Sequence, residues 1–184
     1  SEPKKELVLS KASEWLKRLE DWEHKIRQKF IDIYGEDPEY IEDRKQAYIE
    51  LLKTFISKYG DREVVICRAP ARVNLMGRHI EHRGGSINVM SVNKETLVCA
   101  AKRDDDTVYI SNLNPKFKDY SFSIMEIIKN VDTQNWVEFI ENDTILKMVT
   151  ESKGEWVNYV KAAVLRLQLQ NKDLIISGMD MMFS

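Results

Sequence analysis

Histidine and cysteine are scarce in this chain, which has three of the first and two of the second among 184 residues. No spacing between them suits a structural zinc site, and we predict none. Cys67 and Cys99 lie in apolar or β-branched runs, where a free thiol packs as a small hydrophobe. We therefore expect both to be reduced core residues. Reduced thiols are typical of the cytoplasm, where we place the chain.

An excess of positive charge is also missing. The chain has 28 Lys and Arg against 30 Asp and Glu, for a formal net charge of −2, whereas nucleic-acid-binding domains commonly have a pI above about 9. No uncharged apolar run approaches the roughly 20 residues that a membrane-spanning helix needs, and the first thirty residues lack a secretory signal. The composition excludes a general nucleic-acid binder and a transmembrane protein, and it disfavours export.

Helical periodicity dominates the first sixty residues. Apolar residues recur three and four apart over residues 10–34, with Ser10 as a candidate N-cap and Gly35 as a candidate C-cap. A second helical face starts after Asp37 and ends at Gly60. We predict a helical hairpin that forms an N-terminal extension over residues 1–60.

The two predicted helices end alike, at residues 30–35 and 55–60. We interpret this likeness as shared C-cap chemistry and not as a structural repeat. Trp15 and Trp22 lie on one face of the first helix. That face either packs on the following domain, which we favour, or docks a partner helix as an interaction arm.

Short β-branched segments follow Gly60 and predict strands at residues 64–67, 87–92, 97–101 and 108–110. We expect residues 104–106, three aspartates, to form a solvated hairpin turn and not a metal cluster. Predicted helices cover residues 125–129, 137–148 and 155–170, and a strand-like run covers 178–184. The fold class is α+β with a mixed or antiparallel sheet. We expect a second domain over 61–184 that is incomplete at its C-terminus, so that the chain is the N-terminal piece of a longer protein.

Chemistry-bearing residues are concentrated between residues 68 and 85, which hold four Arg, two His, one Glu and three Gly. Hydrogen-bond donors at this density, beside one carboxylate and flexible backbone, suit recognition of a polyhydroxylated or anionic small molecule. A charged surface loop without a ligand is an equal alternative from composition alone.

This segment resembles the first signature of the galactokinase-like GHMP small-molecule kinases. The resemblance is gap-free over residues 69–82, APARVNLMGRHIEH, and continues into Gly84 and Gly85. Residues 156–161, WVNYVK, are similar to a second conserved helix of the same family. The resemblance extends roughly from Phe55 to the C-terminus. It implies the fold of a GHMP kinase N-terminal domain, which is of the ribosomal protein S5 domain 2-like type.

The resemblance implies roles for individual residues. Arg72 would lie beside the phosphoryl-transfer centre, where a guanidinium can hold phosphate oxygens or stabilise developing charge; a strand-end salt bridge is its alternative. Glu81 occupies the position of the family's sugar-binding Asp. His79 matches a family histidine that either contacts the sugar or packs beside it. Gly84 and Gly85 match the turn that lets the backbone approach the sugar.

The chain also departs from the galactokinase pattern. Arg78, His82 and Arg83 stand where galactokinases carry Glu, Tyr and Asn, so the expected substrate pocket loses an acceptor and gains positive charge. This favours an acidic sugar, because guanidinium groups pair well with carboxylates and phosphates, and the HIEHRGG sub-pattern looks like galacturonate-type kinases. An acidic sugar such as a uronic acid and a neutral hexose such as galactose remain open alternatives.

For the nucleotide, the resemblance points to Trp156 and Tyr159 beside the adenine, with Ser111 as a further candidate; a simple core role is the alternative for both aromatic residues. The implied activity of the parent protein is transfer of the γ-phosphoryl group of ATP to the anomeric hydroxyl of a sugar, with Mg²⁺ bridging the phosphates. The family's phosphate-binding loop and catalytic Asp would follow Ser184, in a missing C-terminal half. We therefore expect these 184 residues alone to be catalytically silent. A non-catalytic sensor that binds sugar and nucleotide is the rival hypothesis.

Overall fold

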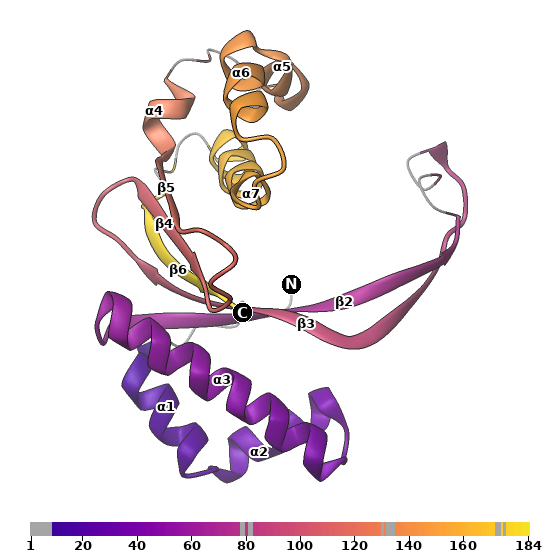
Figure 1. Cartoon of the computed structure of the whole chain (residues 1–184), viewed down its shortest axis with the longest axis vertical. Helices are drawn as coiled ribbons and strands as arrows, with labels where there is room; N and C mark the ends of the chain where they lie inside the picture. Colours follow the sequence, from indigo (N-terminus) through magenta and orange to yellow (C-terminus); the bar gives the residue numbers. More distant parts are fainter. Residues whose placement is uncertain are drawn as a thin grey trace.

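A mixed six-stranded sheet with helices on both sides forms the body of the protein (Figure 1). The computed structural model describes residues 9–77, 80, 83–129, 131, 135–171, 174 and 176–184. The helices are α1 (Ala12–Glu20), α2 (His24–Tyr34), α3 (Pro38–Tyr59), α4 (Ile124–Ile128), α5 (Trp136–Glu141), α6 (Asp143–Glu151) and α7 (Val157–Gln170). The strands are β1 (Ser10–Lys11), β2 (Glu63–Met76), β3 (Asn88–Lys102), β4 (Thr107–Asn112), β5 (Tyr120–Ser123) and β6 (Met179–Phe183). The α+β prediction is confirmed.

The strand order is β1-β2-β3-β6-β4-β5. Strands β4 and β6 run parallel, and the other neighbours run antiparallel. Because β6 lies between β3 and β4, the prediction of a hairpin turn at residues 104–106 is wrong. The turn is instead held by its own side chains: Asp105 accepts hydrogen bonds from Arg103 and from the Thr107 amide.

Strand β6 separates two hydrophobic cores. Met182 packs with residues of α1, α3, β2 and β3 in the first core, whereas Met179, Met181 and Phe183 pack against the second core, which α4–α7, β4 and β5 supply. This alternation follows from the two-residue period of a strand. The one acidic residue of β6, Asp180, is buried on the side of Met182 and pairs with Arg62 and Arg103.

The described part of the N-terminal extension, residues 9–60, contains three helices and not the predicted two. Ser10 pairs with Val64 in β1 and does not cap a helix. The helix predicted over residues 10–34 is broken after α1, and Trp22 adopts a left-handed φ of 50° at the break. The apolar period continues across the break because α1 and α2 both turn their apolar faces toward one core. Trp15 and Trp22 pack against that core, which confirms the packing alternative.

The shared ending of the two predicted helices is confirmed as C-cap chemistry. Gly35 and Gly60 both have φ of 84°. Their amides donate hydrogen bonds of 2.9 Å to the carbonyls of Ile31 and Ile56 respectively. Glycine adopts this left-handed conformation at little cost.

Several other boundaries differ from expectation. The two strands predicted over 87–92 and 97–101 are one long strand, β3, which spans Asn88–Lys102. Strand β2 continues to Met76 through most of the predicted loop. Asn142 divides the helix predicted over 137–148, because its side chain accepts the Thr144 amide as the N-cap of α6. Cys99 is buried as expected, but the prediction for Cys67 is wrong, since this thiol is exposed on the other face of β2–β3.

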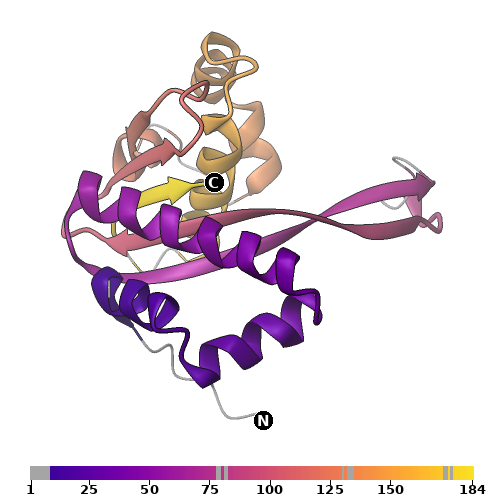
Figure 2. The same cartoon turned by 60° about the horizontal axis from the view of Figure 1, so that its bottom comes forward.

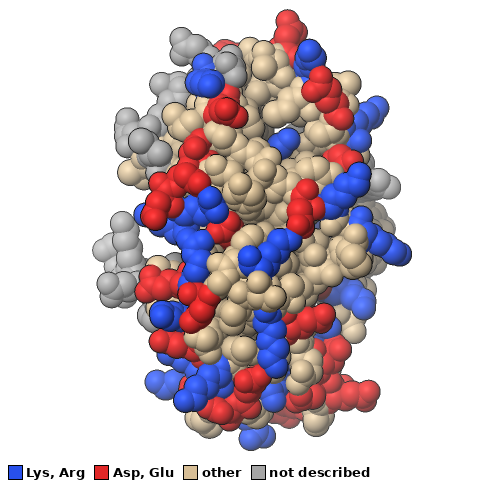
Figure 3. All heavy atoms as spheres, turned by 60° about the vertical axis from the view of Figure 1, so that its left-hand side comes forward, with Lys and Arg blue, Asp and Glu red and all other residues tan. Residues whose placement is uncertain are grey.

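On the molecular face shown in Figure 3, acidic and basic side chains are interspersed and are not gathered by sign. This mixed surface agrees with the near-neutral net charge of the chain. None of the helices in the described part of the chain is long and apolar enough to span a bilayer.

Candidate functional site

A two-stranded arm carries four of the predicted site residues: Arg72, Arg83, Gly84 and Gly85. Strand β3 pairs with β6 only from Val98 to Lys102, so residues 69–76 of β2 and 88–96 of β3 have no strand partner but each other among the described residues. Figures 1 and 2 both show this part of the hairpin extending away from the body. We call these two segments, with the described tip residues between them, the arm.

The two faces of the arm differ in chemistry. Arg72 lies opposite Ser91, and Asn74 lies opposite Val89, on one face. The neighbouring pair, Val73 and Met90, lies on the other face because successive strand residues alternate. The register shifts twice along the arm, between Pro70 and Arg72 and between Asn74 and Met76, and such irregularities commonly re-aim side chains near binding sites. The arm's large apolar side chains are exposed: Val73, Leu75, Met76, Val89 and Met90.

Arg72 itself is exposed and forms no ion pair with any other residue that the structure describes. The strand-end salt bridge kept as its alternative is therefore not made with a described residue. An exposed, unpaired guanidinium on a strand is available to an anionic ligand. Its role beside a phosphoryl group stays a prediction.

Glycines shape the arm tip. Gly77 has φ of 84°, and a Cβ at this position would lie 2.6 Å from the carbonyl oxygen of Ser86. The amides of Arg83 and Gly85 both donate to the carbonyl of Ile80 at 3.0 Å. Gly84 has φ of 78°, which fits the turn role predicted for it. The predicted sugar-binding residues Arg78, His79, Glu81 and His82 lie outside the described residues.

A buried carboxylate fastens the root of the arm to the N-terminal helices. The Glu95 side chain is 1 % exposed and pairs with Arg68 on β2 and with Arg44 on α3. The hydroxyl of Tyr34 donates to the same carboxylate and lies 3.1 Å from the hydroxyl of Tyr48. Burial, followed by the hydrogen bond with Tyr48, raises the pKa of Tyr34. This cluster was not predicted from the sequence, because its members lie far apart along the chain.

An aromatic cluster occupies the body of the protein. The ring of Trp156 lies 5.2 Å from that of Phe183 and 6.0 Å from that of Phe117, and its indole N–H donates to the carbonyl of Lys118 at 3.0 Å. Tyr159 is 83 % exposed, one turn along α7. Two of the three predicted nucleotide-binding residues are thus on one side of α7, beside exposed aromatic surface that could stack on a purine.

Ser111, the third nucleotide candidate, is 1 % exposed, and its hydroxyl hydrogen-bonds to that of Tyr59. Burial raises the pKa of Tyr59. The hydroxyl of Ser111 is therefore engaged in joining β4 to the end of α3. The arm bearing Arg72 extends away from α7 in both views (Figures 1 and 2), so the described residues do not bring the predicted catalytic and nucleotide groups together.

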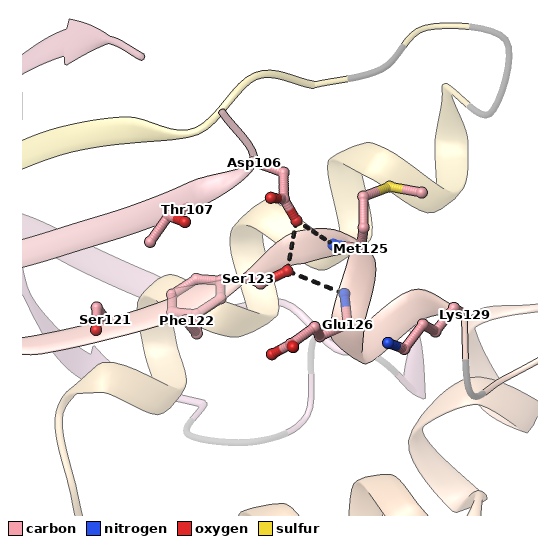
Figure 4. A pocket seen from close by; sticks show the side chains of 8 residues that line it. All are labelled: Asp106, Thr107, Ser121, Phe122, Ser123, Met125, Glu126 and Lys129. Carbon is pink, nitrogen blue, oxygen red and sulfur yellow. Dashed lines mark hydrogen bonds between the residues drawn. The ribbon is translucent and has the colours of Figure 1, made fainter. Parts of the chain in front are cut away.

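An open hollow of about 600 Å³ lies where β4 and β5 meet α4 (Figure 4). One of its lining residues, Asp106, accepts hydrogen bonds from Ser123 Oγ and from the Met125 amide. The Ser123 hydrogen bond holds the pKa of the Asp106 carboxyl below its usual range. Ser123 in turn accepts the Glu126 amide at 3.0 Å. These contacts commit Asp106 to capping α4. Within the described ranges, no group of three or more His, Cys, Asp or Glu side chains could hold a metal ion.

Comparison with known proteins places the arm in a family context. Residues 53–102 match the galactokinase galactose-binding signature. The galactokinase of Dictyostelium discoideum is 30% identical over 121 residues, which is 62% of this chain and 23% of that protein. The galactokinase of Schizosaccharomyces pombe is 26% identical over 123 residues, covering 67% of this chain and 21% of that protein.

Among solved structures, Lactococcus lactis galactokinase complexed with galactose matches with a TM-score of 0.47 and 26% identity, over 71% of this chain and 29% of that one. The chain spans between a fifth and a quarter of the length of the two curated relatives named above. It is galactokinase-related, and its residues 53–102 carry the galactose-binding signature of that family.

Proposed function

We propose that this chain supplies the sugar-binding arm of an ATP-dependent sugar 1-kinase, which transfers the γ-phosphoryl group of ATP to the anomeric hydroxyl of galactose or a related sugar. The proposal is supported by the overlap between the family signature and the arm. The galactose-binding signature matches residues 53–102. This range contains the end of α3 and the whole β2–β3 hairpin, including every described arm residue.

The arm is suited to the sugar because its tip brings backbone donors and acceptors close together. The tight turn at Gly77 and the hydrogen bonds onto Ile80 fix the backbone of the tip, and the space beside Gly84, where a Cβ would meet nothing within 4 Å, is open to a ligand. Glu81 would accept hydrogen bonds from sugar hydroxyls, with His79 beside it. Arg72, on strand β2, would face the phosphoryl group. A fixed guanidinium there would stabilise the negative charge that develops in the transition state.

The identity of the sugar depends on positive charge at the tip. Arg83 is exposed, and with Arg78 and His82 it would favour a sugar that carries a carboxylate. A uronic acid such as galacturonate is therefore proposed beside galactose. A panel of galactose, galacturonate and glucuronate separates the two, because a guanidinium–carboxylate contact is lost when the carboxylate becomes a hydroxymethyl group.

ATP would be held on the body through Tyr159, whose ring is 83 % exposed, and through the part of the Trp156 ring that its packing against the second core leaves accessible. Aromatic rings of this kind can stack on a purine. Bound ATP supplies the phosphoryl group, and Mg²⁺ neutralises its charge. The described residues offer no metal-binding group, so we assign no part of a Mg²⁺ site to them. Ser111 would take part only if its hydrogen bond with Tyr59 broke. We propose that further polypeptide of the kinase, the missing C-terminal half, completes the site.

The first test measures the binding of galactose to the 184-residue chain, with saturation-transfer NMR as the method of detection. Galactose should bind, and Glu81→Ala should weaken binding at least tenfold, since it removes the acceptor for sugar hydroxyls. Glu20→Ala, an exposed change on α1, is the matched control. Absence of galactose and galacturonate binding to the folded wild-type chain would contradict the proposal.

Catalysis is tested separately. We expect no ATP-dependent phosphorylation from this chain alone, because positioning and charge stabilisation of the triphosphate supply most of the rate in such reactions. Turnover that scales with chain concentration and disappears in Arg72→Ala, but not in the exposed α2 variant Arg27→Ala, would contradict this. A non-catalytic sensor would bind sugar and nucleotide but would stay without turnover when the complete protein is assayed.

A further inference from the structure

The two strands of the arm are unequal in length beside Arg72. Pro70 pairs with Glu95, and Arg72 pairs with Ser91, so β2 advances two residues between these pairs while β3 advances four. Strand β3 therefore carries two extra residues here, in a bulge within residues 92–94. A bulge bends its strand and increases the local twist. This one lies where the arm leaves the body, so its shape affects the direction of the whole arm.

Arg72 lies on the face of the hairpin that the N-terminal helices cover nearer the body. Side chains alternate along a strand, so the face of β2 that holds Ile66 and Arg68 also holds Arg72. Ile66 packs against the first core, and Arg68 pairs with Glu95. One face of β2 thus passes from the helix-covered root to the exposed Arg72. A change in the packing at the root would therefore be passed directly to Arg72.

Two tyrosines beside the junction of α2 and α3 contact β3 at this bulge. Tyr34, the last residue of α2, donates to Glu95 at 2.9 Å. Tyr40, in the first turn of α3, donates to the main-chain carbonyl of Asn93 at 3.4 Å. The two rings meet edge to face with their centroids 5.7 Å apart. The junction is at the end of the N-terminal helices toward which the arm extends (Figures 1 and 2).

We propose that Tyr34 and Tyr40 are positioning residues of the proposed sugar kinase. They fix the bend of β3, and with it the angle at which the arm carries Arg72 and the sugar-binding tip. The inference rests on the proposed function, in which the arm holds the sugar and the body holds ATP. The angle of the arm then sets the separation of the two substrates, and a misplacement of about 1 Å can slow a reaction on the order of a hundredfold.

The angle of the arm is measured in the full chain by double electron–electron resonance. One spin label is attached at Asn88→Cys on the arm and a second at Lys147→Cys on α6, both of which are exposed positions. Cys67 is replaced by serine, so that the buried Cys99 is the only other thiol. This labelled parent should give one narrow distribution of distances between the two labels.

Conservative variants of the two tyrosines test their role. Tyr34→Phe and Tyr40→Phe keep the rings and remove only the hydroxyls. Each should broaden the distance distribution, and the double variant should broaden it most. Tyr109→Phe is the matched control, because Tyr109 is an exposed residue of β4 whose ring lies under the Arg103 guanidinium. It should leave the distribution unchanged.

A galactose titration of the same variants separates the root of the arm from its tip. Because the tyrosines lie at the root, all the phenylalanine variants should bind galactose within about twofold of the parent affinity. Glu81→Ala should do the opposite, with weaker galactose binding and an unchanged distance distribution. Absence of galactose binding in the parent would contradict the proposed function, whereas the distance distributions decide whether these tyrosines fix the arm.

Three results would overturn the positioning role. The first is a distance distribution in the double variant that is as narrow as that of the parent, even if the urea midpoint falls, because the tyrosines would then only stabilise the fold. The second is a parent distribution that is already as broad as that of the double variant. The third is equal broadening in Tyr109→Phe, which would indicate a general loosening of the protein.

Discussion

The hydroxyl of Tyr34 donates a hydrogen bond of 2.9 Å to the carboxylate of Glu95, and this contact joins helix α2 to strand β3 at the root of the arm. Arg44 of α3 and Arg68 of β2 pair with the same carboxylate. Four elements therefore meet on one buried acidic group. Because no other described strand lies beside the arm beyond this point, the direction in which the arm leaves the body is set here.

Replacing Glu95 should destabilise the protein. Glu95→Ala leaves two guanidiniums and a tyrosine hydroxyl without their acceptor. We expect this change to lower the free energy of unfolding by about 2–3 kcal/mol. The loss is smaller than for a fully buried pair because both arginines are partly exposed. Glu95→Gln keeps an acceptor and should cost about half as much. Urea denaturation measures both. Glu50→Ala, an exposed change on α3, should stay within about 0.5 kcal/mol of wild type, and equal values for Glu95→Ala and Glu50→Ala would refute the anchoring role.

A close approach of two strands makes Gly178 irreplaceable. A Cβ at this position would lie 2.5 Å from the Thr107 amide nitrogen and closer still to its carbonyl oxygen, and the Gly178 amide donates to the carbonyl of Asp105. Gly178→Ala must push β6 from β4, between the two cores, and should cost more than about 3 kcal/mol or prevent folding. Gly154→Ala provides the comparison, since φ is 85° there but nothing lies within 4 Å. It should cost only the left-handed strain of about 1–2 kcal/mol.

The two cysteines should differ in reactivity. Cys67 is exposed and Cys99 is buried, and burial raises the pKa of the Cys99 thiol to about 12. The thiolate is the nucleophile, so iodoacetamide at pH 8 should modify Cys67 and spare Cys99 in the folded chain. Mass spectrometry of peptides reads this directly. Modification of both at equal rates under native conditions would show that the β3 strand opens readily.

Burial of Cys99 also predicts a pH dependence of stability. The folded-state pKa of this acid is raised above that of the unfolded chain, so its contribution is present below about pH 9 and is lost as the pH rises toward 12. Between pH 8 and pH 10 the free energy of unfolding of the wild type should fall by about 1 kcal/mol more than that of Cys99→Ala, which lacks this thiol. Urea titrations at the two pH values measure the difference. The same loss in Cys99→Ala would assign it to other groups, such as the buried tyrosines.

The class of fold, the start of α3 and the C-terminal ends of α2 and α3 could be predicted from the sequence, because these helix ends rest on local chemistry. Asp37 accepts the amides of Glu39 and Tyr40 as the N-cap of α3, and Gly35 and Gly60 close their helices as predicted. The helix break at Trp22 could not be predicted from the sequence. The apolar residues keep a helical spacing across the turn, because the helices on both sides of it pack on one core. The insertion of β6 between β3 and β4 depends on pairing over about seventy residues, which no local pattern encodes.

The candidate site divides in the same way. The motif at residues 69–82 indicated a sugar-binding segment, and the family signature covers it. The motif did not indicate that Arg72 would lie on a free-standing arm, or that Ser111 would be buried against Tyr59. Strand alternation fixes which face a residue occupies only when the register is known, and the arm contains two register shifts. The Glu95 cluster joins residues up to 61 positions apart, so it was invisible until the fold was known.

Gly77 provides the sharpest test of the arm as a binding element. Its φ of 84° and the 2.6 Å distance from a hypothetical Cβ to the Ser86 carbonyl oxygen mean that Gly77→Ala must distort the tip. The described residues of the tip belong to neither hydrophobic core, so we expect the urea midpoint to stay near that of wild type while galactose affinity falls at least tenfold. Gly84→Ala is the matched control, because its φ of 78° brings strain but its Cβ would meet nothing within 4 Å. It should reduce galactose affinity less than Gly77→Ala does. If Gly77→Ala bound galactose as tightly as the wild type does, the arm tip would not form the sugar site. If the variant lost affinity and global stability together, the arm would be part of the folding unit, and the loss of affinity would report unfolding.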